Sequence, residues 1–381
     1  MRFCVDAHTI GCHLTGNEVY IRNLLNEFAK LESRDEFIAY VSKPEAPSYV
    51  PERCRIERVS ENPYQRLGWD LPRRVRKDRA DLLHVQYTAP LFCQVPLVVS
   101  VHDVSFLEHP QYFTRFRARQ LRLTVKRTVE RAAAVLTPSD FSRASILRHY
   151  RIDPAKVVVV PNAVSSQFRP IDRRVAAAAV RKKFGVAGPM ILMVGDLQPR
   201  KNHLGLLKAF EEAIHAYPQL PHQLVFVGKE TWYSKELHHA VERSRARGRV
   251  HFTGFVEDAD LVQFYGACDL FVFPSFYEGF GLPILEAMAC GRAVACSSTT
   301  AMPEVADASA ILFDPHSPWE MARALTDVLL NPELRVRLER LGAHRATMFS
   351  WERAAERTLD VYMSVVGERK RVQTAVRARA I

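Results

Sequence analysis

Two glutamates separated by seven residues, Glu278 and Glu286, are the side chains most suited to chemistry. Glu278 follows the β-forming run Leu270–Phe273 and a turn rich in Gly, Pro and Ser, and the next helix is predicted to begin at Pro283. Glu286 then falls in the first helical turn. Ligands of open α/β sheets bind at the carboxyl ends of strands. Two carboxylates there could accept charge-assisted hydrogen bonds from the hydroxyl groups of a sugar.

The same stretch offers main-chain donors at the predicted start of the helix. The N–H groups of Phe280, Gly281 and Leu282 lie there, and glycine lets an anionic group approach the main chain. A structural alternative exists for Glu286, because the helix dipole favours a carboxylate in the first turn whatever its function. The spacing of the two glutamates leaves both interpretations open.

A pair of cations, Arg200 and Lys201, follows the buried-strand run Met190–Val194 and Gly195. An amphipathic pattern begins directly after them, which predicts that they stand at the amino terminus of a helix. Two cations and free N–H groups can converge there on an anion. The alternative is a pair of solvated surface cations.

Three further candidates lie in the first half of the chain. His102 ends the predicted strand Pro96–Val101, and Asp103 could orient its imidazole by hydrogen bonding. Gly16 could admit a phosphate near the start of a helix, and Asn162 could contact a ligand from a turn. Each has a structural alternative, as a satisfied histidine or as ordinary turn residues.

The elements that position these residues alternate between buried strands and helices in both halves of the chain. Continuous Val, Ile and Leu runs are typical of parallel sheets covered on both faces. We predict an α/β fold of two doubly wound, Rossmann-like domains, because 381 residues suffice for two domains of about 150 residues or more. The expected domains are residues 1–170 and 171–350, with a hinge within 165–189. Residues 351–381 should form a terminal helix that crosses back to the first domain, followed by a basic tail.

The residues between and after the glutamates, Gly-Phe-Gly-Leu-Pro and Ala-Met-Ala-Cys-Gly, make the motif specific. With them the stretch resembles the E-x7-E signature of retaining, nucleotide-sugar-dependent glycosyltransferases of the group 1 and family 4 type. That group includes bacterial mannosyltransferases of cell-surface polysaccharide synthesis. Gly195–Asn202 is similar to the family's Gly-x-x-x-Pro-Arg-Lys-Asn stretch. The resemblance implies the GT-B fold, in which two Rossmann-like domains face each other across the ligand cleft.

The resemblance also implies roles for the candidate residues. Glu286 would bind the ribose hydroxyls and Glu278 the sugar hydroxyls, while Arg200 and Lys201 would stabilise the leaving diphosphate. His102 would face the transferred sugar and the acceptor. The rest of the implied donor site consists of Phe280, Gly281, Leu282, Gly195, Gly16 and Asn162.

Two acidic residues depart from the family pattern. Glu18 stands in a loop where relatives commonly read Gly-x-Gly-Arg-Tyr, and Asp196 stands where many relatives carry an arginine after the glycine. The Arg contact is therefore not expected in this chain, and the phosphate contact of the first loop is in question.

The implied reaction is transfer of a hexose with retention of anomeric configuration, by front-face attack. The nucleotide sugar is a co-substrate and no cofactor is expected, with GDP-mannose favoured over UDP-glucose. The acceptor would be a glycan or a polyprenyl-linked glycan. No metal is expected, because protein cations can neutralise the diphosphate. Two alternatives stay open: a glycan phosphorylase of the same fold, and a non-catalytic basic protein that binds a membrane surface.

The formal charge of +11 indicates an acidic partner. The basic segment Arg115–Arg127 carries apolar residues at Phe116, Leu123 and Val125, which suits a helix lying against an anionic membrane surface. A solvated helix face is the alternative. No recognised nucleic-acid module occurs, so nucleic acid is not expected as a partner.

The first residues lack the apolar run of a signal peptide, and no apolar stretch reaches the ~20 residues of a membrane span. Seven cysteines without a Cys-x-x-Cys pair argue against a disulfide framework or a zinc site. We therefore expect a cytoplasmic protein, peripheral at the inner face of the cell membrane.

Overall fold

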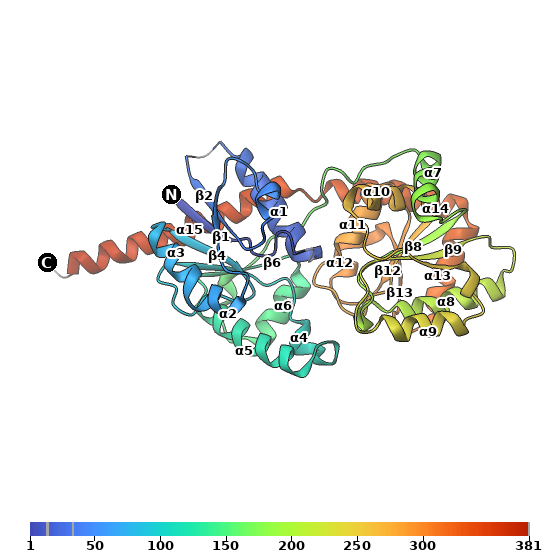
Figure 1. Ribbon diagram of the computed structural model, residues 1–381, viewed down its shortest axis with the longest axis horizontal. Helices are drawn as coiled ribbons and strands as arrows, with labels where there is room; N and C mark the ends of the chain where they lie inside the picture. The colour runs from blue at the N-terminus through green and yellow to red at the C-terminus, as the bar shows by residue number, and fades with distance from the viewer. Residues whose placement is uncertain (13–14, 33, 380–381) are drawn as a thin grey trace. The chain divides into compact units, whose positions relative to one another are not determined.

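The computed structural model describes residues 1–12, 15–32 and 34–379, and its strands form two parallel sheets, one in each of two units (Figure 1). The first unit comprises Met1–Asn162 and Ser350–Ile381, and the second comprises Ala163–Phe349. The chain leaves the first unit after Asn162, eight residues before the boundary expected at 170. Both sheets have the doubly wound, all-parallel arrangement that the Val, Ile and Leu runs predict.

The sheet of the first unit has the strand order β3-β2-β1-β4-β5-β6-β7, so its order reverses between β1 and β4. Such a reversal opens a crevice at the carboxyl edge of a sheet. The strands are β1 (Arg2–Asp6), β2 (Glu36–Val41), β3 (Arg55–Arg58), β4 (Leu82–Gln86), β5 (Leu97–Ser100), β6 (Ala134–Thr137) and β7 (Val157–Val159). The helices that flank this sheet are α1 (Thr15–Lys30), α2 (Pro63–Gln65), α3 (Leu71–Lys77), α4 (Ser105–Glu108), α5 (Arg115–Arg131), α6 (Asp140–His149) and α15 (Trp351–Arg379).

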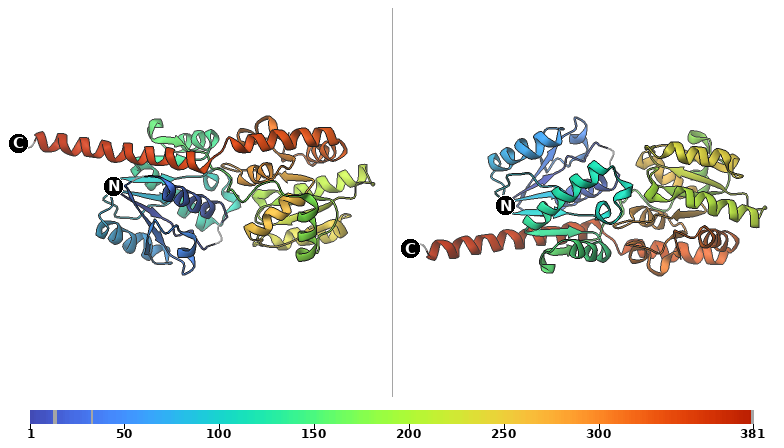
Figure 2. Two further views of the ribbon diagram at one scale, coloured as in Figure 1. Left: turned by 90° about the horizontal axis from the view of Figure 1, so that it is seen from above. Right: turned by 90° about the horizontal axis from the view of Figure 1, so that it is seen from below.

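The terminal helix α15 packs against the first unit beside α1 (Figures 1 and 2). The Tyr362 ring lies 5.2 Å from the ring of Phe3, and its hydroxyl lies 2.5 Å from His84 Nδ1. His84 is fully buried, and its Nε2 is 2.7 Å from Ser100 Oγ. Apolar packing and a buried hydrogen-bonded pair therefore hold the last helix on β1, β4 and β5.

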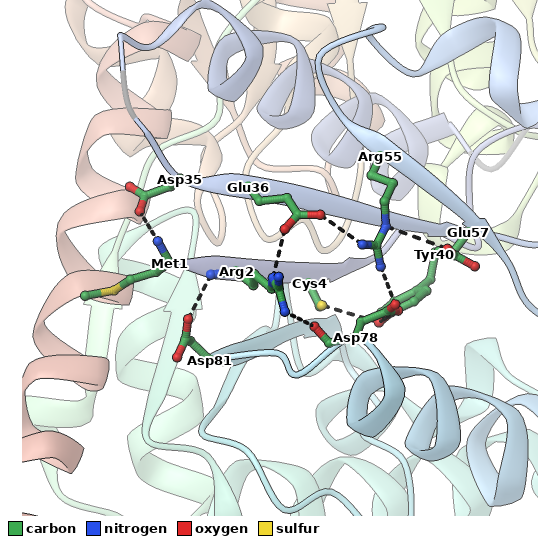
Figure 3. Close-up of polar contacts among 10 residues, drawn as sticks. All are labelled: Met1, Arg2, Cys4, Asp35, Glu36, Tyr40, Arg55, Glu57, Asp78 and Asp81. Atoms are coloured by element: carbon green, nitrogen blue, oxygen red, sulfur yellow. Dashed lines mark hydrogen bonds and ion pairs between the residues drawn. The ribbon is translucent and has the colours of Figure 1, made fainter.

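A polar network joins the amino-terminal ends of β1 and β2 to β3 (Figure 3). Glu36 accepts hydrogen bonds from Arg2 Nε and Arg55 Nη1, both at 2.9 Å. Asp78 forms an ion pair with Arg55 and accepts a 2.8 Å hydrogen bond from the Tyr40 hydroxyl. These contacts lie at the opposite edge of the sheet from the candidate residues, so their role is structural.

The sheet of the second unit has the order β10-β9-β8-β11-β12-β13 and reverses between β8 and β11. Its strands are β8 (Met190–Val194), β9 (Gln223–Val227), β10 (Val250–Phe252), β11 (Leu270–Phe273), β12 (Val294–Ser297) and β13 (Ile311–Phe313). The helices are α7 (Arg173–Phe184), α8 (His203–Ala216), α9 (Ser234–Arg243), α10 (Asp258–Ala267), α11 (Leu282–Ala289), α12 (Met302–Ala306), α13 (Pro318–Leu330) and α14 (Pro332–Thr347).

The segment expected as a hinge, 165–189, is largely part of the second unit. Ala176 and Val180 on α7 are fully buried, and the Phe184 ring lies 4.8 Å from the ring of Phe264 on α10. Most of the expected linker thus belongs to the second unit, because Ala176 and Val180 form a buried face on which this charged helix packs against α10.

Candidate active site

A buried ion-pair cluster forms at the carboxyl edge of the second sheet. Arg200 and Lys201 lie in a 3-10 turn (Pro199–Lys201) directly before α8, and Glu278 lies in the loop after β11. Arg200 Nη1 and Lys201 Nζ are each 2.7 Å from Glu278 Oε1. The side chains of Arg200, Lys201 and Glu278 are only 18%, 12% and 12% exposed. The alternative of solvated surface cations is therefore wrong.

The charges of this cluster depend on one another. Burial alone raises the pKa of Glu278, but the adjacent Arg200 and Lys201 lower it to about 2. Burial lowers the pKa of Lys201, and the carboxylate of Glu278 opposes that shift. The Lys201 ammonium also lies 4.8 Å from the centre of the Phe273 ring, where the π face attracts a cation. The cluster thus holds one carboxylate between two cations.

Glu286 lies in a different environment from Glu278. Its Oε2 accepts a 2.8 Å hydrogen bond from the hydroxyl of Tyr265 on α10. Burial raises the pKa of Glu286 to about 7, although this hydrogen bond lowers it. Helix α11 begins at Leu282, so Glu286 lies in its second turn. The sequence predicted that Glu286 lies in the first turn, and this prediction was wrong. The helix dipole acts mainly within the first turn, so it does not account for this buried carboxylate.

The helix start at Gly281 has the backbone geometry that the sequence indicated. Gly281 is the N-cap with φ +107°, in the region that favours glycine, and an added Cβ would lie 3.2 Å from Ile284 Cδ1. The side chain of Phe280 is buried in the core, and its ring lies 5.8 Å from that of Phe349. Ligand binding by the main chain of Phe280, Gly281 and Leu282 stays a prediction.

Gly195 is required by close packing at the end of β8. An added Cβ would lie 3.3 Å from Cδ and Cε of Lys201, so the glycine makes room for the lysine stem. Gly228, directly after β9, also packs closely against Gly195, since a Cβ added to Gly228 would lie 2.1 Å from Gly195 O. Gly195 therefore helps to place the Lys201 ammonium beside Glu278.

His102 belongs to the first unit, where it is partly buried after β5. Its Nε2 lies 3.1 Å from Gln86 Oε1, and its ring packs edge-on against Tyr20 at 4.7 Å. Burial lowers the pKa of His102 to about 4, so the imidazole is neutral at pH 7. The expected orienting role of Asp103 is wrong: its Oδ1 accepts hydrogen bonds from the N–H and hydroxyl of Ser105, and Gln86 contacts the imidazole instead.

Gly16 and Asn162 also lie in the first unit. Gly16 is exposed in the first turn of α1, with open space where a side chain would be. In the loop before it, the Gly11 N–H donates a 2.8 Å hydrogen bond to Glu18 Oε1. Asn162 is buried, and its Oδ1 has no hydrogen-bond partner among the residues that the structure describes. Ligand binding by Gly16 and Asn162 stays a prediction.

Three residues that the sequence did not indicate complete the second-unit site. Tyr265 holds Glu286, Phe273 lies under Lys201, and the Thr300 hydroxyl accepts a 3.2 Å hydrogen bond from the Glu278 N–H. Thr300 has φ +59°, an uncommon value for a residue other than glycine, which brings its loop to the motif. Tyr265 and Phe273 carry no local signal, because both read as ordinary core residues of a helix and a strand.

Within the described ranges, no group of three or more His, Cys, Asp or Glu side chains is placed to hold a metal ion. None of the helices described has the length and apolarity needed to cross a membrane.

Comparison with known families and proteins assigns the chain to a family. The model of glycosyl transferases group 1 matches residues 179–345, and the model of glycosyltransferase family 4 matches residues 14–168. The O-antigen chain mannosyltransferase B of Escherichia coli is 33% identical over 265 residues, which are 70% of this chain and 69% of that protein. The serotype-specific mannosyltransferase WbdA of Escherichia coli is 29% identical over 281 residues. That match covers 71% of this chain but only 34% of WbdA, so the chain spans about a third of that relative.

Solved structures agree on the fold. Sucrose-phosphate synthase from Thermosynechococcus elongatus superposes with a TM-score of 0.79 at 20% identity, covering 96% of this chain and 99% of that one. Anabaena HepE in complex with UDP-glucose superposes with a TM-score of 0.78 at 19% identity, covering 96% of this chain and 100% of that one. The family matches, the two reversing parallel sheets and the E-x7-E cluster together show that this chain belongs to the glycosyltransferases of group 1 and family 4, with the GT-B fold.

Proposed function

We propose that this glycosyltransferase transfers a hexose from a nucleoside diphosphate sugar to a glycan acceptor, with retention of anomeric configuration. The observation that carries the proposal is the buried cluster of Glu278, Arg200 and Lys201 at the reversal of the second sheet. Cations held at the amino terminus of a helix suit a diphosphate, because N–H groups and positive charge point to the same place.

The two cations would stabilise the charge that develops on the leaving diphosphate. Their positions are already set by Glu278 and by the Phe273 ring, so little reorganisation is needed during the reaction. Fixed charges of this kind are commonly the largest catalytic contribution. Because Arg200 and Lys201 supply the neutralising charge, we propose that transfer needs no metal and no cofactor.

The two glutamates would bind hydroxyl groups at different ends of the donor. With a pKa of about 2, Glu278 is a weak base, so we assign it to the sugar hydroxyls and not to nucleophilic attack. Glu286 would accept hydrogen bonds from the ribose hydroxyls, with Tyr265 holding its carboxylate. Main-chain N–H groups of the Gly281 turn would bind the sugar and phosphates. We infer front-face attack, in which the leaving phosphate accepts the proton of the acceptor hydroxyl.

The donor that we favour is GDP-mannose, because the two curated relatives described above are named as mannosyltransferases. UDP-glucose is the main competitor. The acceptor would be a glycan or polyprenyl-linked glycan of surface polysaccharide synthesis, reached at the cytoplasmic face of the membrane. Neutral His102 would face the transferred sugar and the acceptor.

A thermal-shift screen of the purified chain against GDP, UDP, ADP and their sugar derivatives tests the donor proposal. A ligand that binds the native state raises the melting temperature by mass action. We expect one nucleotide family to stabilise the wild type, with GDP-mannose giving the largest shift, and Glu286→Ala to lose it. Glu236→Ala, an exposed glutamate on α9 of the same unit, is the matched control and should keep the shift.

Absence of any shift at millimolar nucleotide sugar would contradict this function. Stabilisation by orthophosphate and oligosaccharides alone would indicate a phosphorylase instead. For an identified donor, NMR of the glycosylated product should show the anomeric configuration of the donor, and inversion would overturn the proposed retention.

A further inference from the structure

Helix α5 of the first unit exposes two large apolar side chains on the face that points away from the core. Phe116 and Leu123 lie seven residues apart, about two helical turns, so they share one face. They are 72% and 62% exposed. Val125, which the sequence placed with them, is fully buried beside Val129 on the core side, so that part of the expectation was wrong. The exposed apolar pair is therefore separate from the residues that hold α5 on the sheet.

A row of cations lies beside this apolar pair. Arg115, Arg119, Arg122 and Lys126 follow one another at spacings of four, three and four residues, so they form one stripe along the helix, and all four are exposed. The helix carries seven cations and a single acid, Glu130. Its outer surface therefore combines apolar side chains with strong positive charge.

A neighbouring loop extends the apolar row. Arg127 lies one turn after Leu123, and its Nη2 donates a 2.5 Å hydrogen bond to the carbonyl of Leu91. Arg131 Nη1 donates to the same carbonyl at 3.1 Å. These contacts place Leu91 and Phe92 next to the second half of α5, and the Phe92 side chain is 74% exposed.

A third segment joins the loop from the other side. The Leu91 N–H donates a 3.0 Å hydrogen bond to the carbonyl of Leu67, which lies in the π-helical turn η2 (Arg66–Asp70). Trp69 in the same turn is 71% exposed. We call Trp69, Leu91, Phe92, Phe116 and Leu123 with the four cations of the stripe the docking surface.

We propose that the docking surface binds the headgroup region of a bilayer that contains anionic lipids. The cations complement acidic headgroups, each at a gain of about fivefold in affinity near the surface. The large exposed apolar side chains on α5 and on the segments bonded to it can enter the boundary between headgroups and acyl chains. The phosphates of a nucleic acid could pair with the cations, but a nucleic acid has no apolar layer that would bury the side chains of Leu123 and Leu91. The inference rests on the proposed function in that it names the surface on which a lipid-linked acceptor is met.

Vesicle co-sedimentation of the full chain, without any nucleotide, tests the proposal apart from the donor chemistry. We expect binding to phosphatidylcholine vesicles that contain phosphatidylglycerol, and little binding to phosphatidylcholine alone. Arg119→Glu with Arg122→Glu should weaken binding by about thirtyfold or more, and Phe116→Ser with Leu123→Ser by about tenfold. The matched control is Arg181→Glu with Lys182→Glu, an exposed cationic pair on α7 of the second unit, which should bind as the wild type does.

Wild-type affinity in the Arg119 and Arg122 variant, or an equal loss in the α7 control, would overturn the proposal. So would failure of the wild type to bind anionic vesicles while it binds nucleic acid or an acidic protein.

Tryptophan quenching by brominated lipids identifies the face that meets the membrane. Quenching should occur in the wild type and be largely lost in Trp69→Phe. Trp319→Phe, which removes a tryptophan that is 63% exposed in the second unit, should leave it intact. The reverse pattern would show that a different surface contacts the lipid.

Discussion

The two units have the same kind of connection at corresponding places, from β1 to α1 and from β8 to α8, yet different charged side chains lie at the two connections. In the first unit the Gly11 N–H already donates to Glu18, a carboxylate of the protein itself. In the second unit, Arg200 and Lys201 stand before α8, next to Glu278. At the first connection a buried carboxylate from α1 therefore accepts from the main chain, whereas two cations lie at the second connection.

This difference shows that the topology of a doubly wound sheet supplies a place for a ligand, whereas the loop residues decide which charge that place accepts. Asp6, at the end of β1, adds to the contrast. Burial alone raises its pKa, but His8 and Arg66 lower it to about 2, so it stays ionised. This contrast supports the proposal that a nucleoside diphosphate binds to the second unit.

The largest effect is expected when one of the two cations of the second unit is removed. Lys201→Met removes the ammonium beside Glu278 while keeping an unbranched side chain against the Phe273 ring. We expect kcat/KM for sugar transfer to fall about 10³-fold, because a preorganised charge aimed at the leaving group is lost. Lys208→Met, an exposed lysine on α8, is the control and should retain wild-type activity. Retention of more than a tenth of the activity by Lys201→Met would contradict the assigned role.

A second test contrasts the two glutamates through the pH dependence of folding. The pKa of Glu286 is raised to about 7 from 4.5, so above pH 4.5 the unfolded chain ionises more readily and the folded state loses stability up to about pH 7. Glu286→Gln removes this cost and can still accept the Tyr265 hydrogen bond. We expect this variant to be more stable than the wild type by about 3 kcal/mol at pH 8, with no gain at pH 4, by urea unfolding.

Glu278→Gln is the matched comparison, with the opposite sign. Since the pKa of Glu278 is lowered to about 2, its ionised form stabilises the fold above pH 4.5, and that contribution is lost as pH falls towards 2. This variant should be less stable than the wild type by about 3 kcal/mol at pH 7. Equal pH profiles for the two variants would show that the environments of the two glutamates do not differ as described.

The smallest expected effect concerns the first unit. Glu18→Gln retains an acceptor for the Gly11 N–H but removes the charge that strengthens the bond. We expect the free energy of unfolding to fall by about 1 kcal/mol and the KM for the donor to stay within about twofold of the wild type. A large change in donor KM, measured beside the unfolding curve, would mean that the first loop does take part in donor binding.

The sequence predicted the strands and the motif well because both depend on local patterns. Continuous apolar runs gave β8 and β11 with the bounds that the structure has. Strand β13 (Ile311–Phe313) was missed, because a run of three residues at the sheet edge carries little periodic signal. Gly281 is left-handed directly before α11, a conformation that favours glycine, while its contact with an anion stays a prediction.

The environments of the candidate residues could not be predicted in this way. Tyr265, which holds Glu286, precedes it by 21 residues on another helix, and Gln86 reaches His102 from a neighbouring strand. Val125 was assigned to the membrane face, although packing of α5 on the sheet places it in the core. The positions of Tyr265 and Val125 depend on which helix face meets its neighbours, and the contact between Gln86 and His102 depends on which strands pair, so no local pattern reveals them.

The sequence by itself therefore determined the fold class, the family resemblance and the identity of Glu278, Glu286, Arg200 and Lys201, because strand composition, turn chemistry and motif spacing are local properties. Tertiary structure alone decided that Glu278 lies between two cations while Glu286 is buried against Tyr265. The physical reason is that pKa values and charge pairing depend on burial and on neighbours brought from distant segments, so two identical residues of one motif acquire opposite electrostatic behaviour.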